Sequence, residues 1–479
     1  MRLLIFCLWL CSFPLAAQTP WSLDECIRFG IEQNLALKNK QLDTRIAKEE
    51  YIRSIGSFLP EVSASGDLGK RFGRSVDPKT NLYTNTSFVE SNLGLNVSLP
   101  LFEGFTRINR LKFSRLNQRI SKLNARAKEN EIAYEVMDAF YQLSFEERMF
   151  RLAVEQRQLS ERYMEQTEEY LALGLRSLSD RQEMKARLQS DIYQEKIREN
   201  NCLVSLLRLK ELLNLSASDS LRIAYASDDT ILPPAEYLPA EEVYQLSENV
   251  LPEWQAMQLQ QQAARKSVAL AAAKFSPSFR AEFGWRTGYY NTEKNEQGLT
   301  IPISDQLRNN ENKYVGISVS FPLFTGLSRF TEVRKERLKM KQTDHEAARL
   351  ALTIRADVEN ACQSLRAAVV EHAQALQQWK AEALSLRENE EKWTEGLISV
   401  FELMEKRNRY LSAKAELART RLQYDIKCRT IEFYRTGSFL PDRNPASSAS
   451  GRPPASGENA ANSSGRTFDD PAILNNDPN

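Results

Sequence analysis

One long stretch of the chain places apolar residues alternately three and four positions apart, which is the seam pattern of a coiled coil. Its seam positions are Leu350, Ile354, Val358, Ala361, Leu365, Ala368, His372, Leu376, Trp379, Ala383 and Leu386. Neither Pro nor Gly occurs between Gly326 and Gly396, or between Gly104 and Gly174. Each interval therefore predicts one helix of about 70 residues, roughly 100 Å long at 1.5 Å per residue.

The helical pattern reverses at the glycines that end these intervals. A second helical stretch follows each one and runs to about Leu215 and Tyr434. The short connections predict two antiparallel helical hairpins, over about 104–215 and 326–436. Further helices are predicted over 22–55 and 240–274, each leading into a turn marked by a proline.

Strict alternation of apolar and polar residues predicts four strands, over about 61–72, 88–101, 278–290 and 313–324. In the last of these, Val315, Ile317 and Val319 alternate with glycine and serines. One apolar face opposite a small or charged face fits a transmembrane strand between lipid and water. A half-exposed sheet of a soluble protein gives the same alternation, so the pattern alone leaves both readings open.

The chain contains an internal duplication. Residues 93–107 read LGLNVSLPLFEGFTR and residues 315–329 read VGISVSFPLFTGLSR, 222 positions later. The same offset separates Gly174 from Gly396, at the two predicted tips. We therefore expect one architecture built twice, with a first structural repeat at 18–222 and a second at 223–437.

The two ends of the chain predict export and disorder. Residues 1–17 have the basic start, apolar run and small-residue cleavage site of a secretory signal peptide. Neither Cys7 nor Cys11 follows the small residues of a lipoprotein site, so no lipid anchor is expected. Residues 438–479, rich in Pro, Ser, Gly and Asn, predict a disordered polar tail. No other stretch approaches the ~18 apolar residues of a membrane helix, so strands must make any membrane crossing.

Composition argues against several functions. The 479 residues include 64 Lys and Arg against 63 Asp and Glu. Removing the signal peptide, with Arg2 and no acid, balances these charges, so nucleic acid is an unexpected partner. The remaining cysteines, Cys26, Cys202, Cys362 and Cys428, show no zinc-finger spacing. Buried free thiols are the favoured reading, with a Cys362–Cys428 bond across the second hairpin as the alternative.

No enzyme site is expected. The only histidines, His345 and His372, are too far apart along one straight helix to share a metal. His372 lies on the apolar seam, which favours a packed core histidine. We predict no catalytic residues, metal or cofactor.

Four strands per chain are too few for a closed membrane barrel, since the smallest single-chain barrels need about eight. Open strand edges are not tolerated in lipid, so the predicted barrel is shared between subunits. The polar connections at 72–86 and 290–312 would then face the outside.

With its signal peptide, two copies, LPLFEG and FPLFTG turns and Gly-Leu-x-Ser tips, the chain resembles the outer-membrane efflux family of TolC-type channels. The resemblance runs from Trp21 to Gly437. It implies an α+β membrane protein in the outer membrane: a homotrimer with a twelve-stranded β-barrel and an α-helical tunnel through the periplasm. It further implies a periplasmic adaptor, an inner-membrane transporter and outer-membrane lipid as partners.

The resemblance also assigns residues at the closed end of the tunnel. Family members place acidic rings six and nine positions after the second tip glycine, which implies a pore constriction at Glu402 and Glu405. The first copy places Asp180 and Glu183 equivalently. An ordinary solvated helix end is the alternative reading. Residues of the gate are implied at the tips: Gly174, Gly396, Trp393 and Arg176, with Ile398 where the family often has a latch arginine.

The leading functional hypothesis is therefore a passive outer-membrane exit duct of a tripartite efflux or type I secretion system. The alternative is a periplasmic coiled-coil adaptor, which also uses a helical hairpin. Adaptors carry one hairpin between small β domains, whereas this chain alternates two hairpins with lipid-type strands. An enzyme is the weakest of the three hypotheses.

Overall fold

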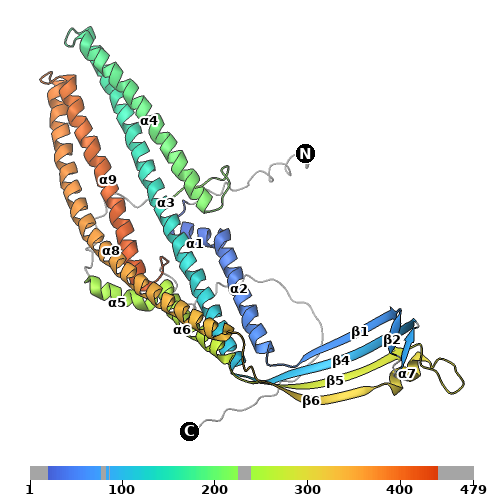
Figure 1. The fold of residues 1–479 in the computed structure, drawn as a ribbon. Coiled ribbons are helices and arrows are strands. Elements are labelled where there is room, and N and C mark those ends of the chain that lie inside the picture. Colours follow the sequence, from blue (N-terminus) through green and yellow to red (C-terminus); the bar gives the residue numbers. More distant parts are fainter. Residues whose placement is uncertain (1–19, 77–81, 86, 225–238, 441–479) are drawn as a thin grey trace, which may run out of the picture. The chain divides into compact units, whose positions relative to one another are not determined.

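The computed structural model describes residues 20–76, 82–85, 87–224 and 239–440 (Figure 1). The predicted signal peptide and residues 441–479 of the predicted tail lie outside these described residues. The same order of helices, strands and a long helical hairpin occurs twice along the chain, as the duplication predicted, and the strands of both copies form one main sheet. Among the described residues, none of the helices combines the length and apolar character needed to cross a membrane.

Two helical hairpins dominate the structure. The long helices α3 (Thr106–Ala172) and α8 (Ser328–Thr394) have 67 residues each. Their return helices are α4 (Leu178–Leu212) and α9 (Val400–Thr436). The predicted seam of α8 is buried at Ile354, Val358, Ala361, Leu365, Ala368 and His372. Coiled-coil packing of a three-four seam therefore holds the second hairpin together.

Shorter helices flank the long ones (Figure 1). The first pair is α1 (Leu23–Gln33) and α2 (Leu35–Gly56), and the second is α5 (Ala240–Val250) and α6 (Pro252–Ala273). Each predicted helical stretch is thus broken once. Asn34 caps the start of α2, because its side chain accepts a hydrogen bond from the Leu37 amide at 3.1 Å. Pro252 occupies the first position of α6, where the missing amide proton of proline costs no hydrogen bond within the helix. Helix α3 packs against both α2 and α6, and α6 also packs against α8.

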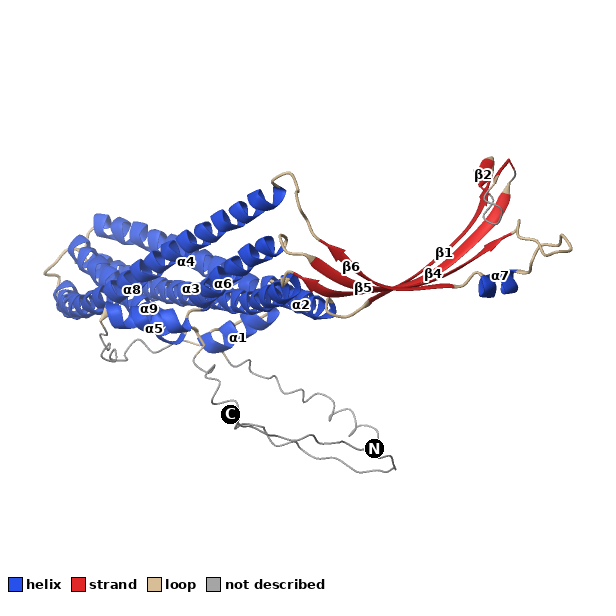
Figure 2. Cartoon of the chain, turned by 60° about the horizontal axis from the view of Figure 1, so that its bottom comes forward, coloured by secondary structure: helices blue, strands red, loops and turns tan. Residues whose placement is uncertain are grey.

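The main sheet is antiparallel with the order β1-β4-β5-β6 (Figure 2). Its strands are β1 (Glu61–Arg71), β4 (Phe88–Glu103), β5 (Ser278–Tyr290) and β6 (Asn312–Ser320). Strands β4 and β5 therefore join the two copies, while β1 and β6 are edges. The connections at the far end contain a small hairpin, β2 (Arg74–Val76) with β3 (Tyr83–Asn85), and the helix α7 (Ile303–Asn309).

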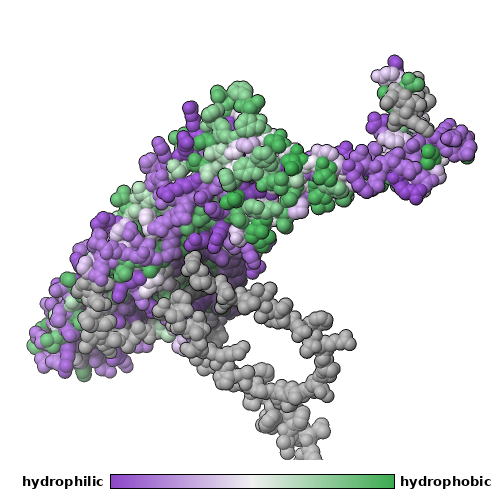
Figure 3. All heavy atoms as spheres, turned by 90° about the horizontal axis from the view of Figure 1, so that it is seen from below, coloured by the Kyte–Doolittle hydropathy of each residue, from purple (hydrophilic) through white to green (hydrophobic). Residues whose placement is uncertain are grey.

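The strand register puts the apolar residues of both copies on one face. Val97 lies opposite Val62 on one side and Phe283 on the other, and Phe283 lies opposite Val315. Val315 is 78% exposed. Figure 3 shows hydrophobic residues where the strands meet the helices, and hydrophilic ones at the far end of the sheet. The predicted alternation is thus confirmed, and it leaves a wide apolar face uncovered in the single chain.

Two boundaries differ from the prediction. Strand β6 ends at Ser320, before the predicted end at Phe324, because its partner β5 begins at Ser278, directly opposite Ser320. The folded chain also extends past the predicted start of the tail at 438. Phe439 is buried and its ring stacks on Phe433 with 4.4 Å between ring centroids.

Candidate functional site

The two hairpins turn at the same kind of glycine. Gly174 and Gly396 have φ of +74° and +77°, a backbone conformation that favours glycine. At the second tip the Leu397 amide donates to the Lys392 carbonyl at 2.9 Å, and the Gly396 amide to the Trp393 carbonyl at 3.0 Å. This is a Schellman turn, which satisfies the last carbonyls of a helix. The first tip has the equivalent bonds, so the duplication reproduces the backbone of the turn.

Each return helix then starts with a capping box. The Ser177 hydroxyl accepts from the Asp180 amide at 3.2 Å, and the Asp180 carboxylate accepts from the Ser177 amide at 3.0 Å. Ser399 and Glu402 make the same reciprocal pair, both bonds at 3.2 Å. Such pairs satisfy free amides at a helix start and place a carboxylate at the positive end of the helix dipole.

The four acids predicted for the constriction thus fall into two kinds. Asp180 and Glu402 are capping residues, so one function in the single chain already accounts for each. Glu183 and Glu405 lie three positions on, both exposed, and Glu405 forms an ion pair with Arg409. All four lie at the tips of the hairpins, as predicted. A constriction would require further copies of the chain, so their role in a pore stays a prediction.

Arg176 joins the first tip to the second. Its guanidinium donates to the Trp393 carbonyl at 3.1 Å and to the Ile398 carbonyl at 3.3 Å. The guanidinium carbon also lies 5.5 Å from the centre of the Trp393 ring, within cation–π range. The structure therefore brings together two of the predicted gate residues. The absence of a latch arginine at 398 is matched by an arginine that reaches across from the other hairpin.

Trp393 is 1% exposed, held among side chains of both hairpins. Tyr163 of α3 contacts it edge-on with 5.1 Å between ring centroids, and Tyr170 lies at 6.1 Å. Burial raises the pKa of Tyr163, so its hydroxyl stays protonated and donates to Glu390 of α8. Aromatic packing and one hydrogen bond to a carboxylate thus connect α3 to α8 close to the tips.

A buried ion pair provides a second connection between the hairpins, and sequence reasoning missed it. Arg407 of α9 is fully buried, and its guanidinium lies 3.4 Å from the Asp191 carboxylate of α4. The same guanidinium donates to the Ser160 hydroxyl at 2.7 Å and to the Gln156 carbonyl, both on α3. Asp191 also accepts from Ser160 and, at 2.6 Å, from Gln156. We call Arg407, Asp191, Ser160 and Gln156 the hairpin clamp.

Burial lowers the pKa of Arg407, and the Asp191 carboxylate acts in the opposite direction. The charge of Arg407 is therefore held in place by the ion pair and the surrounding acceptors rather than by water. Nothing in the sequence distinguishes Arg407 from the many arginines on solvated helix faces. Only the packing of three helices reveals it.

Within the described residues, the histidines and cysteines form no metal site. His372 is buried with Nδ1 at 3.3 Å from the Thr420 hydroxyl, as expected for a packed core histidine, and His345 is exposed. Cys362 and Cys428 border the same apolar core between α5, α8 and α9, yet both are free thiols. Burial raises the pKa of each. Within the described residues, no group of His, Cys, Asp and Glu is arranged to hold a metal.

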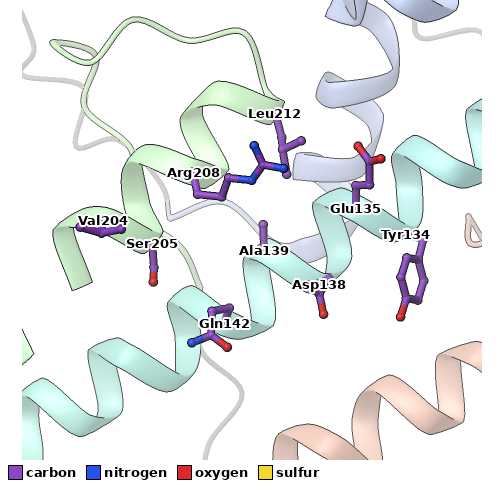
Figure 4. Close-up of a pocket in the computed structure, with 9 residues that line it drawn as sticks. All are labelled: Tyr134, Glu135, Asp138, Ala139, Gln142, Val204, Ser205, Arg208 and Leu212. Atoms are coloured by element: carbon purple, nitrogen blue, oxygen red, sulfur yellow. The ribbon is translucent and has the colours of Figure 1, made fainter. Parts of the chain in front are cut away.

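A cleft of about 320 Å³ lies between α3 and α4, well away from the tips (Figure 4). Val204 and Leu212 of α4 line it together with the two charged α3 residues Glu135 and Asp138. Its walls contain both apolar and charged side chains, and the cleft is open to one side.

Comparison with known proteins places these features in a family. The model of the family described as outer membrane efflux protein matches residues 31–215 and 243–434. The two matched segments correspond to the two copies and include both hairpins. No curated protein matches the chain.

Solved structures share the fold at low sequence identity. The chain is similar to the Campylobacter jejuni CmeC outer membrane channel, with a TM-score of 0.74 and 14% identity over 88% of each chain. It is also similar to the outer membrane protein VceC of Vibrio cholerae, with a TM-score of 0.72 and 13% identity over 87% of this chain and 96% of that one. A third similar structure is the open state of the Neisseria gonorrhoeae MtrE outer membrane channel, with a TM-score of 0.69 and 17% identity over 87% of this chain and 89% of that one.

Proposed function

Because this chain belongs to the outer membrane efflux protein family, we propose that three copies form one export channel, with a shared barrel in the outer membrane and a helical tunnel in the periplasm. The chain is an outer-membrane efflux channel, and transport through it requires no covalent chemistry. No observation favours the adaptor alternative. The matched family covers both hairpins, which alternate with strands of a single sheet.

The observation that carries the trimer is the sheet. It has one exposed apolar face and two edges, β1 and β6, with unpaired backbone groups. In lipid every backbone donor and acceptor needs a partner within the protein. Pairing β6 of one copy with β1 of the next satisfies the edges, and three copies give a closed barrel of twelve strands. The polar sheet face, with Glu282 and Arg280, then lines the water-filled interior.

The hairpins offer a matching surface for assembly. Leu203, Val204 and Leu207 are exposed along α4, beside the cleft between α3 and α4. Exposed apolar patches of this kind mark protein interfaces. In our proposal a neighbouring copy covers this face, so the tunnel wall is continuous around the axis.

At the tips, we propose that Arg176 and Trp393 hold the hairpins together and so keep the tunnel narrow. Glu402, Glu405, Asp180 and Glu183 then surround its inner end, where threefold symmetry makes each one a ring of like charges. Such rings favour cations. Leu173, Leu175, Leu397 and Phe401 are exposed at the same tips, and they offer an apolar surface to a periplasmic adaptor that links the channel to an inner-membrane transporter.

The oligomer is tested by crosslinking the full-length protein in detergent after extraction from the outer-membrane fraction. We expect three subunits to be trapped, and the trimer to dissociate on heating. A monomer that stays monomeric at micromolar concentration contradicts the proposal, because a single sheet cannot close.

The constriction is tested by ion selectivity in planar bilayers. Replacing Glu402 and Glu405 with Gln is expected to lower cation selectivity and to weaken block by a trivalent cation added on the periplasmic side. A matched control replaces Glu346 and Glu371, which are exposed on α8 far from the tips. If the Glu402 and Glu405 variant behaves like the control, the constriction lies elsewhere, with Asp180 and Glu183 as the next pair to replace.

A further inference from the structure

The first part of α3, next to the sheet, carries a stripe of positive charge. Every charged residue between Gly104 and Glu129 is basic. Lys112, Arg115 and Arg119 are three and four positions apart, so they share one face of the helix. All three side chains are exposed. The stripe avoids Phe113, Leu116 and the other positions that pack against α6.

The second copy retains the stripe. The positions 222 residues later are Arg334, Arg337 and Lys341 in α8, again basic and again exposed. Further along the helices the copies diverge, since Lys122 corresponds to Asp344. Along this stripe, the positions of Lys112, Arg115 and Arg119 keep their charge in both halves. We call these six residues the basic belt: Lys112, Arg115, Arg119, Arg334, Arg337 and Lys341.

In the part of the chain that the structure describes, no side chain of the belt makes an ion pair or a hydrogen bond. Neither α3 nor α8 has an acidic residue in its first turn, whereas α1, α4 and α9 all do. A cluster of exposed cations without acidic partners leaves a surface that favours an external anion.

Aromatic contacts connect the belt to the apolar face of the sheet. Phe279 on that face contacts Phe102 with 5.9 Å between ring centroids, and Phe102 contacts Phe105 at 5.3 Å. Ile108 follows three positions after Phe105 and precedes Lys112 by four, so these residues share the face of the stripe. The second copy has Leu327 and Phe330, both exposed, at the positions of Phe105 and Ile108. Each stripe therefore continues an apolar surface that begins on the strands.

We propose that the basic belt binds the headgroups of anionic phospholipids in the membrane leaflet that faces the periplasm. The inference rests on the proposed function, in which the apolar sheet face lies in the outer membrane. Apolar residues followed directly by cations match acyl chains followed by phosphates. Helical side chains lean toward the start of their helix, which here is the membrane end, and long Lys and Arg side chains extend further to reach headgroups. The belt begins about 9 Å along α3 at 1.5 Å per residue.

The test compares lipid selectivity of the full-length trimer in bilayers of phosphatidylcholine with a minority of phosphatidylglycerol. Spin-labelled forms of each lipid report which one is enriched beside the protein. The variant replaces Lys112, Arg115, Arg334 and Arg337 with Gln. A control with the same loss of charge replaces Arg162, Lys185, Lys380 and Lys392, which are exposed on the same hairpins nearer the tips.

We expect the wild type and the control to prefer phosphatidylglycerol several-fold, and the belt variant to lose most of this preference. High salt should reduce the preference of the wild type as well, because it screens exposed charges. Equal preference in the belt variant and the control overturns the inference. So does loss of the trimer in the belt variant with unchanged lipid preference, because a second copy of the chain would then cover this face. Failure of the wild type to insert into any bilayer contradicts the proposed function itself, and the inference with it.

Discussion

The two tips share a backbone and differ in nearly every contact they make. Both turn at a glycine with positive φ, and both restart with a serine capping box. Yet Arg176 of the first tip corresponds to Ile398 of the second, and the buried Arg407 corresponds to the exposed Lys185. The duplication has kept what each hairpin needs to turn, while Arg176 and Arg407, which join one hairpin to the other, have no arginine at the matching position of the other copy.

This asymmetry follows from where the contacts lie. A turn is a local structure, so each copy needs its own glycine and serine. A contact between two hairpins needs only one residue of each kind, such as Arg407 from one and Asp191 from the other. The partner positions are then free to change, and Ala413 now stands where the second copy would have matched Asp191.

The largest effect is expected at the hairpin clamp. Asp191→Ala leaves the fully buried Arg407 without its counter-ion, which typically costs about 3–5 kcal/mol of stability. Thermal dissociation and unfolding of the trimer should therefore shift strongly downward. Lys185→Ala, at the exposed position equivalent to Arg407, should change stability by less than about 0.5 kcal/mol.

A double variant sharpens this prediction. Adding Arg407→Met to Asp191→Ala removes the unpaired charge and should recover part of the lost stability, because an apolar residue tolerates burial. If the single and double variants are equally unstable, packing rather than charge dominates the clamp.

The next effect is expected at the glycines of the turns. Gly396→Val forces a β-branched residue into positive φ, at a cost of at least about 1–2 kcal/mol. Gly174→Val should behave alike, since the two turns have the same backbone. Gly56→Ala serves as control, because Gly56 has an ordinary φ and space around it. Export assays and thermal unfolding both report the change. Unequal effects at the two tips would show that backbone geometry is not their shared requirement.

What the sequence could predict divides along the same line. Hairpins, strands and tips were visible because they depend on periodicity and on single residues such as Gly174 and Gly396. The clamp was not, since Arg407 is one arginine among many and its burial depends on helices far apart in the sequence. The breaks at Asn34 and Leu251 were missed, although Pro252 is a residue that cannot continue a helix and often starts one. The constriction at Asp180 and Glu402 stays a prediction, and the capping role of both residues was overlooked.

A smaller effect is expected at the helix starts. Ser177→Ala and Ser399→Ala each remove a capping side chain, which typically costs about 1 kcal/mol. Hydrogen exchange of the first turns of α4 and α9 should rise by a similar factor in the two variants. Glycine in place of either serine should cost only a few tenths of a kcal/mol. A large difference between the two caps would indicate that one of them is also held by contacts between hairpins.

The smallest effect is expected on acidification, and it should differ between the packed seams of the two hairpins. Burial lowers the pKa of His372 below its usual 6.5, and the nearby Arg421 lowers it further while Asp425 opposes this. Stability from the neutral His372 is therefore complete above about pH 6.5 and is lost as the pH falls toward the lowered pKa. Burial raises the pKa of Asp425, so its protonation at lower pH partly offsets the loss.

Phe150 occupies the equivalent position in the first copy and has no titratable group. Hydrogen exchange between pH 7 and 5 should therefore increase at the seam of α8 and α9 but not around Phe150. His372→Phe should abolish the difference. An equal response of both seams would assign the acid effect to other groups.

The central claim is that contacts between the two hairpins hold a tunnel narrow at its tips. Single-channel recording of the trimer in a planar bilayer tests it most directly. The wild type should conduct ions weakly, and Arg176→Ala, which removes the hydrogen bonds to the Trp393 and Ile398 carbonyls, should raise the conductance severalfold, whereas Lys185→Ala should not. Wild-type trimers that conduct no ions, or an Arg176→Ala variant with unchanged conductance, would contradict the claim.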